Sequence, residues 1–94
     1  MLILQVEHKV PNFDGWKKVF DRDPVKRKKS GVRGYRIFRP TDDPNYAIVD
    51  LEFDNLRDLE KTLTTLHTLW GQVEGKVMVN PKTRILEFVE SKEY

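Results

Sequence analysis

The sequence predicts an α+β domain whose elements follow the order strand, helix, strand, strand, helix, strand. Residues 2–9, 32–39, 46–53 and 82–90 alternate between two faces, as strands do. The stretches after the first and third of these repeat apolar residues at helical spacing. We therefore expect a single ferredoxin-like domain over residues 1–94, with a four-stranded antiparallel sheet and both helices on one face.

Composition narrows the class of protein. The 94 residues are 38% hydrophobic and 34% charged, with a net charge of +2. A chain of this size buries only about two thirds of its unfolded surface, so association with a second copy would add stability. The absence of cysteine excludes disulfides, thiolate zinc sites and a cysteine nucleophile. Because the apolar start is interrupted at Gln5 and Glu7, we expect a cytoplasmic protein with no membrane segment.

The first crossover should be helical. Asn12 or Asp14 can cap a helix, and Asp23-Pro24 predicts a kink in it or a short second helical piece, which ends at Ser30-Gly31. This helix should face the side of the first strand that carries His8. The apolar residues expected on the two meeting surfaces are Leu2, Leu4 and Val6 on the strand and Phe13, Trp16, Val19 and Phe20 on the helix.

The second half of the chain repeats the pattern. Residues 40–45 are dense in turn formers and predict a hairpin loop. Asp54 is the predicted cap of a second helix that should end at Trp70, before Gly71. Asn80-Pro81 predicts a turn, and residues 72–80 should be irregular or carry a short extra strand at 77–79. The inner stripe of the second helix is Leu56, Leu59, Leu63, Leu66 and Trp70.

The open face of the predicted sheet mixes apolar and charged side chains. It could be a solvated surface with scattered apolar residues, or it could pack against the sheet of a second copy. We favour the homodimer because the core is small. The residues expected on this face are Ile3, Gln5, Glu7, Tyr35, Ile37, Ile48, Asp50, Glu52, Ile85, Glu87 and Val89.

A few residues are candidates for chemistry. His8 could act as a general base, because the unperturbed pKa of histidine lies near neutrality, or it could be a histidine bonded at the edge of the core. Trp16 and Trp70 could form the walls of a flat hydrophobic pocket or simply pack the core. His67, at the flank of the second helical stripe, is a further candidate for substrate binding or an exposed boundary side chain.

The sequence contains no motif for several other kinds of functional site. The two histidines are not at ligand spacing and the acidic residues form no binding loop, so we expect no metal. Neither a Gly-x-Ser-x-Gly motif nor a glycine-rich phosphate loop occurs. The basic run at 26–29 and Arg33-Gly34-Tyr35 raise RNA binding. However, this run falls on the second strand rather than the third, and acidic residues at 42–60 offset its charge, so a nucleic-acid partner is not expected.

Several short motifs resemble those of a known superfamily. They cover nearly the whole chain: His8, Phe13-Asp14-Gly15-Trp16, Asp23-Pro24, Ser30 to Arg36, Asp42 to Tyr46 and Asp50 to Phe53. The chain resembles the dimeric α+β barrel superfamily, which includes antibiotic-biosynthesis-monooxygenase-like and polyketide-cyclase-like proteins. This resemblance implies a homodimer whose two sheets close into a barrel, with ligand pockets between the sheet and the helices of each protomer.

The residues and the resemblance together predict a function. We expect a small homodimer that binds a hydrophobic small molecule without a cofactor, as a cofactor-independent monooxygenase, cyclase or isomerase. The alternative is a non-catalytic binding or assembly domain, which would have its pocket filled by Trp16, Trp70 and leucines. Haem-degrading members of the superfamily use a strand asparagine, a strand tryptophan and a helix histidine. His67 could match the last, but the other two have no counterpart.

Overall fold

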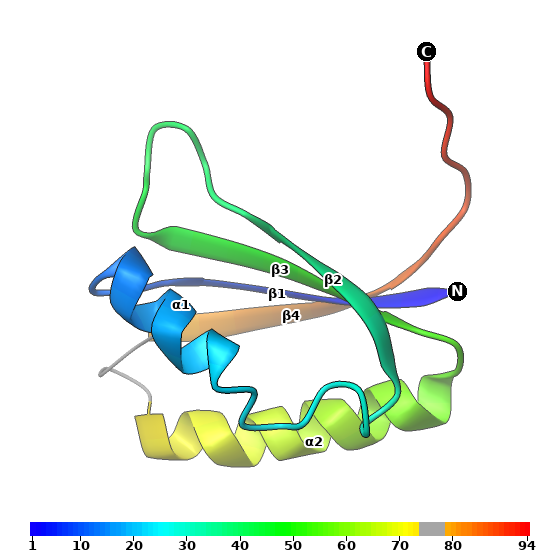
Figure 1. Ribbon diagram of the computed structural model, residues 1–94, viewed down its shortest axis with the longest axis horizontal. Helices are drawn as coiled ribbons and strands as arrows, with labels where there is room; N and C mark the ends of the chain where they lie inside the picture. The colour runs from blue at the N-terminus through cyan, green and yellow to red at the C-terminus, as the bar shows by residue number, and fades with distance from the viewer. Residues whose placement is uncertain (74–78) are drawn as a thin grey trace.

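The computed structural model describes residues 1–73 and 79–94. Its strands pair antiparallel in the order β2-β3-β1-β4, and the two helices lie together on one side of the sheet (Figure 1). This arrangement confirms the predicted βαββαβ plan. The elements are β1 (Leu2–Lys9), α1 (Phe13–Asp21), β2 (Val32–Phe38), β3 (Tyr46–Phe53), α2 (Leu56–Val73) and β4 (Val79–Glu87).

The core lies between the helices and the central strands. Leu4 on β1, Phe53 on β3 and Leu59 on α2 have no exposed surface. Trp16 of α1 and Trp70 of α2 belong to the same buried cluster, so both helical stripes meet one face of the sheet, as predicted. The other buried members of the cluster are Val6, Val10, Val32, Ala47, Val49, Leu51 and Leu66.

The first crossover contains one short helix rather than two pieces. The Asn12 side chain caps α1 by accepting a hydrogen bond from the Gly15 amide at 2.8 Å, as predicted. The predicted second piece is wrong, because Asp23 and Lys26 adopt φ values of +56° and +50°, which interrupt a helix. Asp23 instead accepts a hydrogen bond from the Arg27 amide at 2.9 Å. Residues 22–31 therefore form a loop of turns below the sheet.

The ends of α2 differ from the prediction. Asn55, not Asp54, caps this helix by accepting a hydrogen bond from the Asp58 amide at 2.9 Å. Asp54 is engaged elsewhere, in an ion pair with Arg33 at 3.1 Å. The helix also continues through Gly71 to Val73, where the sequence predicted a stop. A glycine ends a helix only when it takes the left-handed conformation, and Gly31 is the one glycine with positive φ among the described residues.

A bulge in β2 reverses the predicted faces of two side chains. The pairing with β3 shifts register between Val32 and Gly34, so Arg33 is an extra residue. Beyond the bulge, Tyr35 is opposite Leu51 and Ile37 is opposite Val49, and both point toward the helices. Their predicted place on the open face is therefore wrong.

The last strand is also shifted from its predicted position. It begins at Val79 and ends at Glu87, and Asn80-Pro81 forms a one-residue irregularity within the pairing to β1 rather than a turn. Ile85 is opposite Leu4 and Glu87 is opposite Leu2, so both lie on the helix side, and the prediction for them is wrong as well. Val89 lies beyond the strand. The possible extra strand at 77–79 falls largely outside the described residues.

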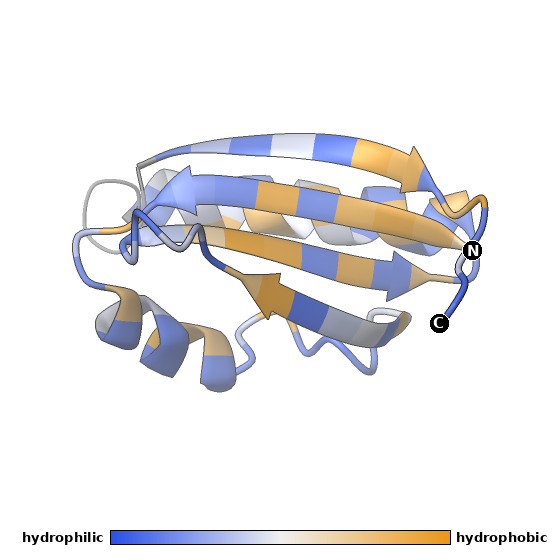
Figure 2. Cartoon of the chain, turned by 90° about the horizontal axis from the view of Figure 1, so that it is seen from above, coloured by the Kyte–Doolittle hydropathy of each residue, from blue (hydrophilic) through white to orange (hydrophobic). Residues whose placement is uncertain are grey.

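The open face carries a polar row between apolar positions (Figure 2). Arg36, Asp50, Gln5 and Arg84 stand side by side across the four strands. The Gln5 amide donates to Asp50 at 3.0 Å, and Arg36 lies 3.9 Å from the same carboxylate. The rows on either side hold the apolar side chains of Ile3, Leu86, Ile48 and Phe38 and the charged side chains of Glu52, Glu7 and Lys82.

Two segments project from the open side of the sheet. The loop between β2 and β3 rises at one end, and the chain after Glu87 rises at the other (Figure 1). The second projection carries the exposed side chains of Phe88, Val89 and Tyr94. Among the described residues, neither helix is long and apolar enough to cross a membrane.

Two glycines provide opposite tests of this fold. Gly31 has φ +95°, and a Cβ there would lie 2.6 Å from a carboxylate oxygen of Asp58, whereas a Cβ at Gly71 would meet no atom within 4 Å. We expect Gly31→Ala to lower the free energy of unfolding by about 1–3 kcal/mol. Gly71→Ala should raise it by up to about 1 kcal/mol, because alanine favours a helix. Urea unfolding of both variants would check this, and a neutral Gly31→Ala would contradict the close approach of the loop to α2.

Candidate functional site

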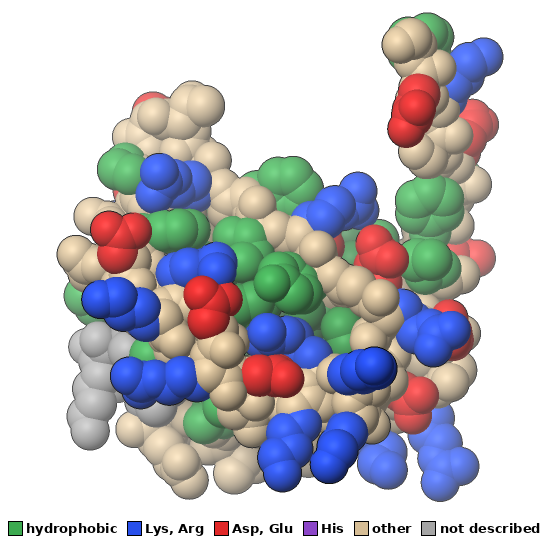
Figure 3. Space-filling model, in the orientation of Figure 1, with side chains coloured by type: hydrophobic (Ala, Val, Ile, Leu, Met, Phe, Trp, Pro, Cys, Tyr) green, Lys and Arg blue, Asp and Glu red, His purple; other side chains and the backbone are tan. Residues whose placement is uncertain are grey.

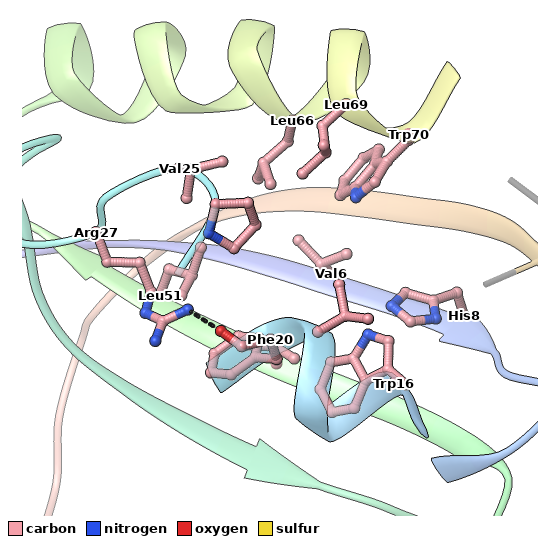
Figure 4. Close-up of a pocket in the computed structure, with 13 residues that line it drawn as sticks. Val6, His8, Trp16, Phe20, Val25, Arg27, Leu51, Leu66, Leu69 and Trp70 are labelled. Atoms are coloured by element: carbon pink, nitrogen blue, oxygen red, sulfur yellow. Dashed lines mark hydrogen bonds between the residues drawn. The ribbon is translucent and has the colours of Figure 1, made fainter. Parts of the chain in front are cut away.

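A pocket lies between the two helices and the sheet (Figure 4). Its cavity of about 120 Å³ is close to the size at which an engineered apolar cavity holds a single benzene ring. Most of its walls are aliphatic or aromatic. The lining residues are Val6, His8, Trp16, Val19, Phe20, Pro24, Val25, Arg27, Val49, Leu51, Leu66, Leu69 and Trp70.

Alternation along β1 brings His8 to this pocket. The strand directs Leu4, Val6 and His8 to the helix side, so the imidazole is buried with only 2% of its surface exposed. Its ring meets that of Trp16 edge to face, with centroids 5.7 Å apart. The ring nitrogen Nδ1 lies 3.3 Å from the backbone carbonyl oxygen of Lys9. This contact favours the tautomer with its proton on Nδ1 and makes Nε2 the acceptor.

Burial also determines the charge of His8. Desolvation lowers the pKa of His8 below its ordinary value, and the hydrogen bond to Lys9 opposes the shift only in part. The imidazole is therefore neutral near pH 7. A neutral histidine at the wall of an apolar pocket has a vacant acceptor nitrogen, which is what a general base requires.

The other predicted site residues divide into two groups. Trp16 and Trp70 come from different helices and both line the pocket. His67 does not line it. It lies on the exposed surface of α2, where its ring is 5.6 Å from that of Trp70, one turn away.

Arg27 is a lining residue that the sequence analysis did not single out. It lies at one end of the pocket and His8 at the other (Figure 4). In the sequence it belongs to a basic run, which usually indicates a solvated surface. Its side chain is nevertheless only 14% exposed, because the loop of residues 22–31 turns back beneath the sheet. That turn depends on the positive φ values of Asp23 and Lys26, which the sequence pattern did not indicate.

The lowered pKa of His8 makes a prediction about acid stability. The unfolded chain takes up a proton at about pH 6.5, whereas the folded chain does so only at lower pH, so protonation favours unfolding within this window. We expect the free energy of unfolding to fall between pH 7 and pH 5. Urea titrations across this range should show a smaller fall for His8→Leu and the wild-type fall for His67→Gln. A wild-type protein that becomes more stable toward pH 5 would contradict the buried neutral imidazole.

No model of a known protein family and no curated protein matches the chain in sequence. Solved structures match it in fold. SnoaB, a cofactor-independent oxygenase from Streptomyces nogalater, is 10% identical with a TM-score of 0.75, over 96% of this chain and 94% of that one. A putative antibiotic biosynthesis monooxygenase from Nitrosomonas europaea is 17% identical with a TM-score of 0.73, over 96% and 100%. Another from Deinococcus radiodurans is 14% identical with a TM-score of 0.72, over 100% and 98%. The chain therefore shares the ferredoxin-like βαββαβ fold of these structures, as predicted.

Proposed function

We propose that this protein is a homodimer that binds a flat, largely hydrophobic small molecule between its helices and its sheet. His8 then removes a proton from the bound molecule. This proton transfer is the step of a cofactor-independent monooxygenase, cyclase or isomerase that the described residues can supply.

The observation that carries the proposal is the buried imidazole of His8 at one end of a pocket whose walls are mostly apolar. The Trp16 and Trp70 side chains supply large apolar surfaces, and each indole N–H can donate one directional hydrogen bond. Apolar walls exclude water and so strengthen the interaction between the base and an acidic C–H or O–H group of the ligand. The arrangement suits a substrate whose carbanion or enolate is stabilised by its own conjugation.

Oxygenation without a cofactor is consistent with this base. Once Nε2 has taken the proton, the electron-rich substrate is the reductant and O₂ is the oxidant. A methylene carbon then loses both hydrogens and gains one oxygen atom as a carbonyl, while the second oxygen atom leaves as water. Isomerisation or cyclisation would use the same deprotonated substrate without O₂. The likeness in fold to a cofactor-independent oxygenase supports the first of these outcomes.

The alternative of a non-catalytic binding domain has less support. It required a pocket filled by Trp16, Trp70 and leucines, and these side chains instead surround a cavity of about 120 Å³ that His8 reaches. RNA binding loses one of two aromatic residues on the second strand, because Tyr35 points toward the helices and packs against Phe20 with ring centroids 5.0 Å apart, whereas Phe38 stays on the open face.

The open face of the sheet is the proposed dimer interface. Apolar side chains such as Ile48 lie on both sides of its polar row. The acidic group in the row, Asp50, already has Gln5 and Arg36 as partners, so covering the face would not leave this carboxylate unpaired. The β2–β3 loop and the chain after Glu87 project on the same side and would flank a second copy (Figure 1).

Proton exchange tests the chemistry directly. In D₂O near neutrality, the wild-type protein should accelerate deuterium uptake at the benzylic position of phenylacetone, a one-ring ketone with an acidic C–H group. We expect His8→Ala to lose roughly 100-fold or more of this acceleration, the usual contribution of a general base. His67→Gln, which alters the chain's other histidine, should retain it. NMR would follow the exchange.

The outcomes separate the two functions. Equal exchange in the wild type and His8→Ala would remove His8 from the chemistry. A ligand that perturbs both tryptophans without any exchange above buffer would favour the non-catalytic domain. Oxygen uptake by the wild type would then distinguish an oxygenase from an isomerase.

A substitution at Ile48 tests the proposed homodimer. Ile48→Lys places a charge among the apolar groups of the proposed interface, so it should shift the protein from dimer toward monomer. Thr64→Lys adds the same charge on the exposed side of α2 and should leave the dimer intact. Light scattering at micromolar concentration measures both. A monomer mass for the wild type would remove the dimer from the proposal.

A further inference from the structure

The pocket is apolar along its length and polar at its two ends. Of the residues that line it, only His8 and Arg27 have titratable side chains. The His8 imidazole is neutral, whereas the guanidinium group of an arginine carries a fixed positive charge. A charged group beside an apolar cavity is costly unless a partner compensates it. The ligand should therefore carry a group that pairs with this fixed positive charge.

Other groups of the protein compensate the positive charge of Arg27 only in part. One guanidinium nitrogen, Nη1, donates to the backbone carbonyl oxygen of Phe20 at 2.9 Å and lies 3.5 Å from a carboxylate oxygen of Asp23. The guanidinium carbon lies 4.0 Å from the centroid of the Phe20 ring and 5.0 Å from that of Tyr35. These contacts hold the group in place. The guanidinium has five N–H donors in its plane, more than these two acceptors use.

The surface outside Arg27 is basic. A second hollow shares Arg27 with the pocket and is also lined by Tyr35, Lys28 and Arg33, with Asp23 as its single acidic residue. Figure 3 shows hydrophobic side chains gathered between α1 and β2, with basic side chains and some acidic ones around them. Such a field concentrates anions at the entrance and accelerates their arrival. Residues 22–33 hold one acidic residue and six basic ones, namely Arg22, Lys26, Arg27, Lys28, Lys29 and Arg33.

We propose that the ligand of this pocket is a one-ring aromatic acid whose carboxylate pairs with Arg27 while its ring lies in the apolar pocket toward His8. This inference rests on the proposed function of the pocket as a ligand site. The cavity volume suits a single ring, and the ring would contact Trp16 and Trp70. Arg27 is thus a specificity-determining residue, and the basic loop around it guides the acid to the entrance.

A matched pair of probes tests the charge. Cinnamate and cinnamamide have the same flat skeleton and differ in a carboxylate against a neutral amide. The chain has two tryptophans, both in the pocket wall, so their indole N–H signals in ¹⁵N NMR spectra report binding directly. We expect the wild type to bind cinnamate about tenfold or more tightly than cinnamamide, because a hydrogen bond to a charged partner is stronger. This preference should weaken as salt is added.

Variants assign the preference to Arg27. Arg27→Gln should reduce cinnamate affinity to the level of cinnamamide and leave cinnamamide affinity unchanged. Lys61→Gln removes one positive charge from the exposed side of α2 and should preserve the preference. If Arg27→Gln does not fold, the comparison of the two probes on the wild type still decides whether the pocket prefers a carboxylate.

Each result has a distinct meaning. Equal binding of the two probes to the wild type would overturn the role of Arg27 while the pocket stands. A preference for cinnamate over cinnamamide that persists in Arg27→Gln would also overturn the role of Arg27. If neither probe moves the indole signals, the proposed ligand pocket fails together with this inference.

Discussion

The burial of one face of β1 is the constraint on which the rest of the structure depends. This strand pairs with β3 on one side and β4 on the other, so its helix-facing side chains lie at the centre of the sheet. Leu4 has no exposed surface, and Val6 and His8 follow it in the same register. Because side chains alternate along a strand, the burial of Leu4 and Val6 also determines the position of the imidazole. A shift of one residue would place His8 in solvent.

The short length of α1 explains why this face has a cavity. The helix has nine residues against eighteen in α2, so the two cannot cover the sheet as a matched pair. The remaining area is bridged by the loop of residues 22–31. Its Ser30 hydroxyl donates to the Val25 carbonyl at 2.7 Å, and its Gly31 packs against Asp58. A loop fixed in this way encloses space rather than filling it.

Local alternation was sufficient to predict β1, β3, the element order and the inward direction of His8. The errors in the faces of the strands arose where one residue interrupted a strand. The bulge at Arg33 turned Tyr35 and Ile37 to the other face, and the irregularity at Asn80-Pro81 accompanied the shift of β4. Bulges depend on the pairing partner, so a single strand does not reveal them. Arg27 was missed for a related reason, since its burial results from a tertiary crossing of the loop rather than from local periodicity.

The positions of the base and the arginine have an evolutionary consequence. His8 is carried by the central strand, where any change disturbs the core, whereas Arg27 is carried by a loop that forms no part of the sheet. The loop is attached to the rest of the protein through the Ser30 carbonyl, which Thr62 approaches to 3.5 Å, and through Val25 and Arg27, which pack against the core and the Phe20 ring. Side chains on the loop can nevertheless be exchanged without changing the pairing of the strands. Selection can diversify the molecules that this scaffold accepts while the reactive strand stays constant.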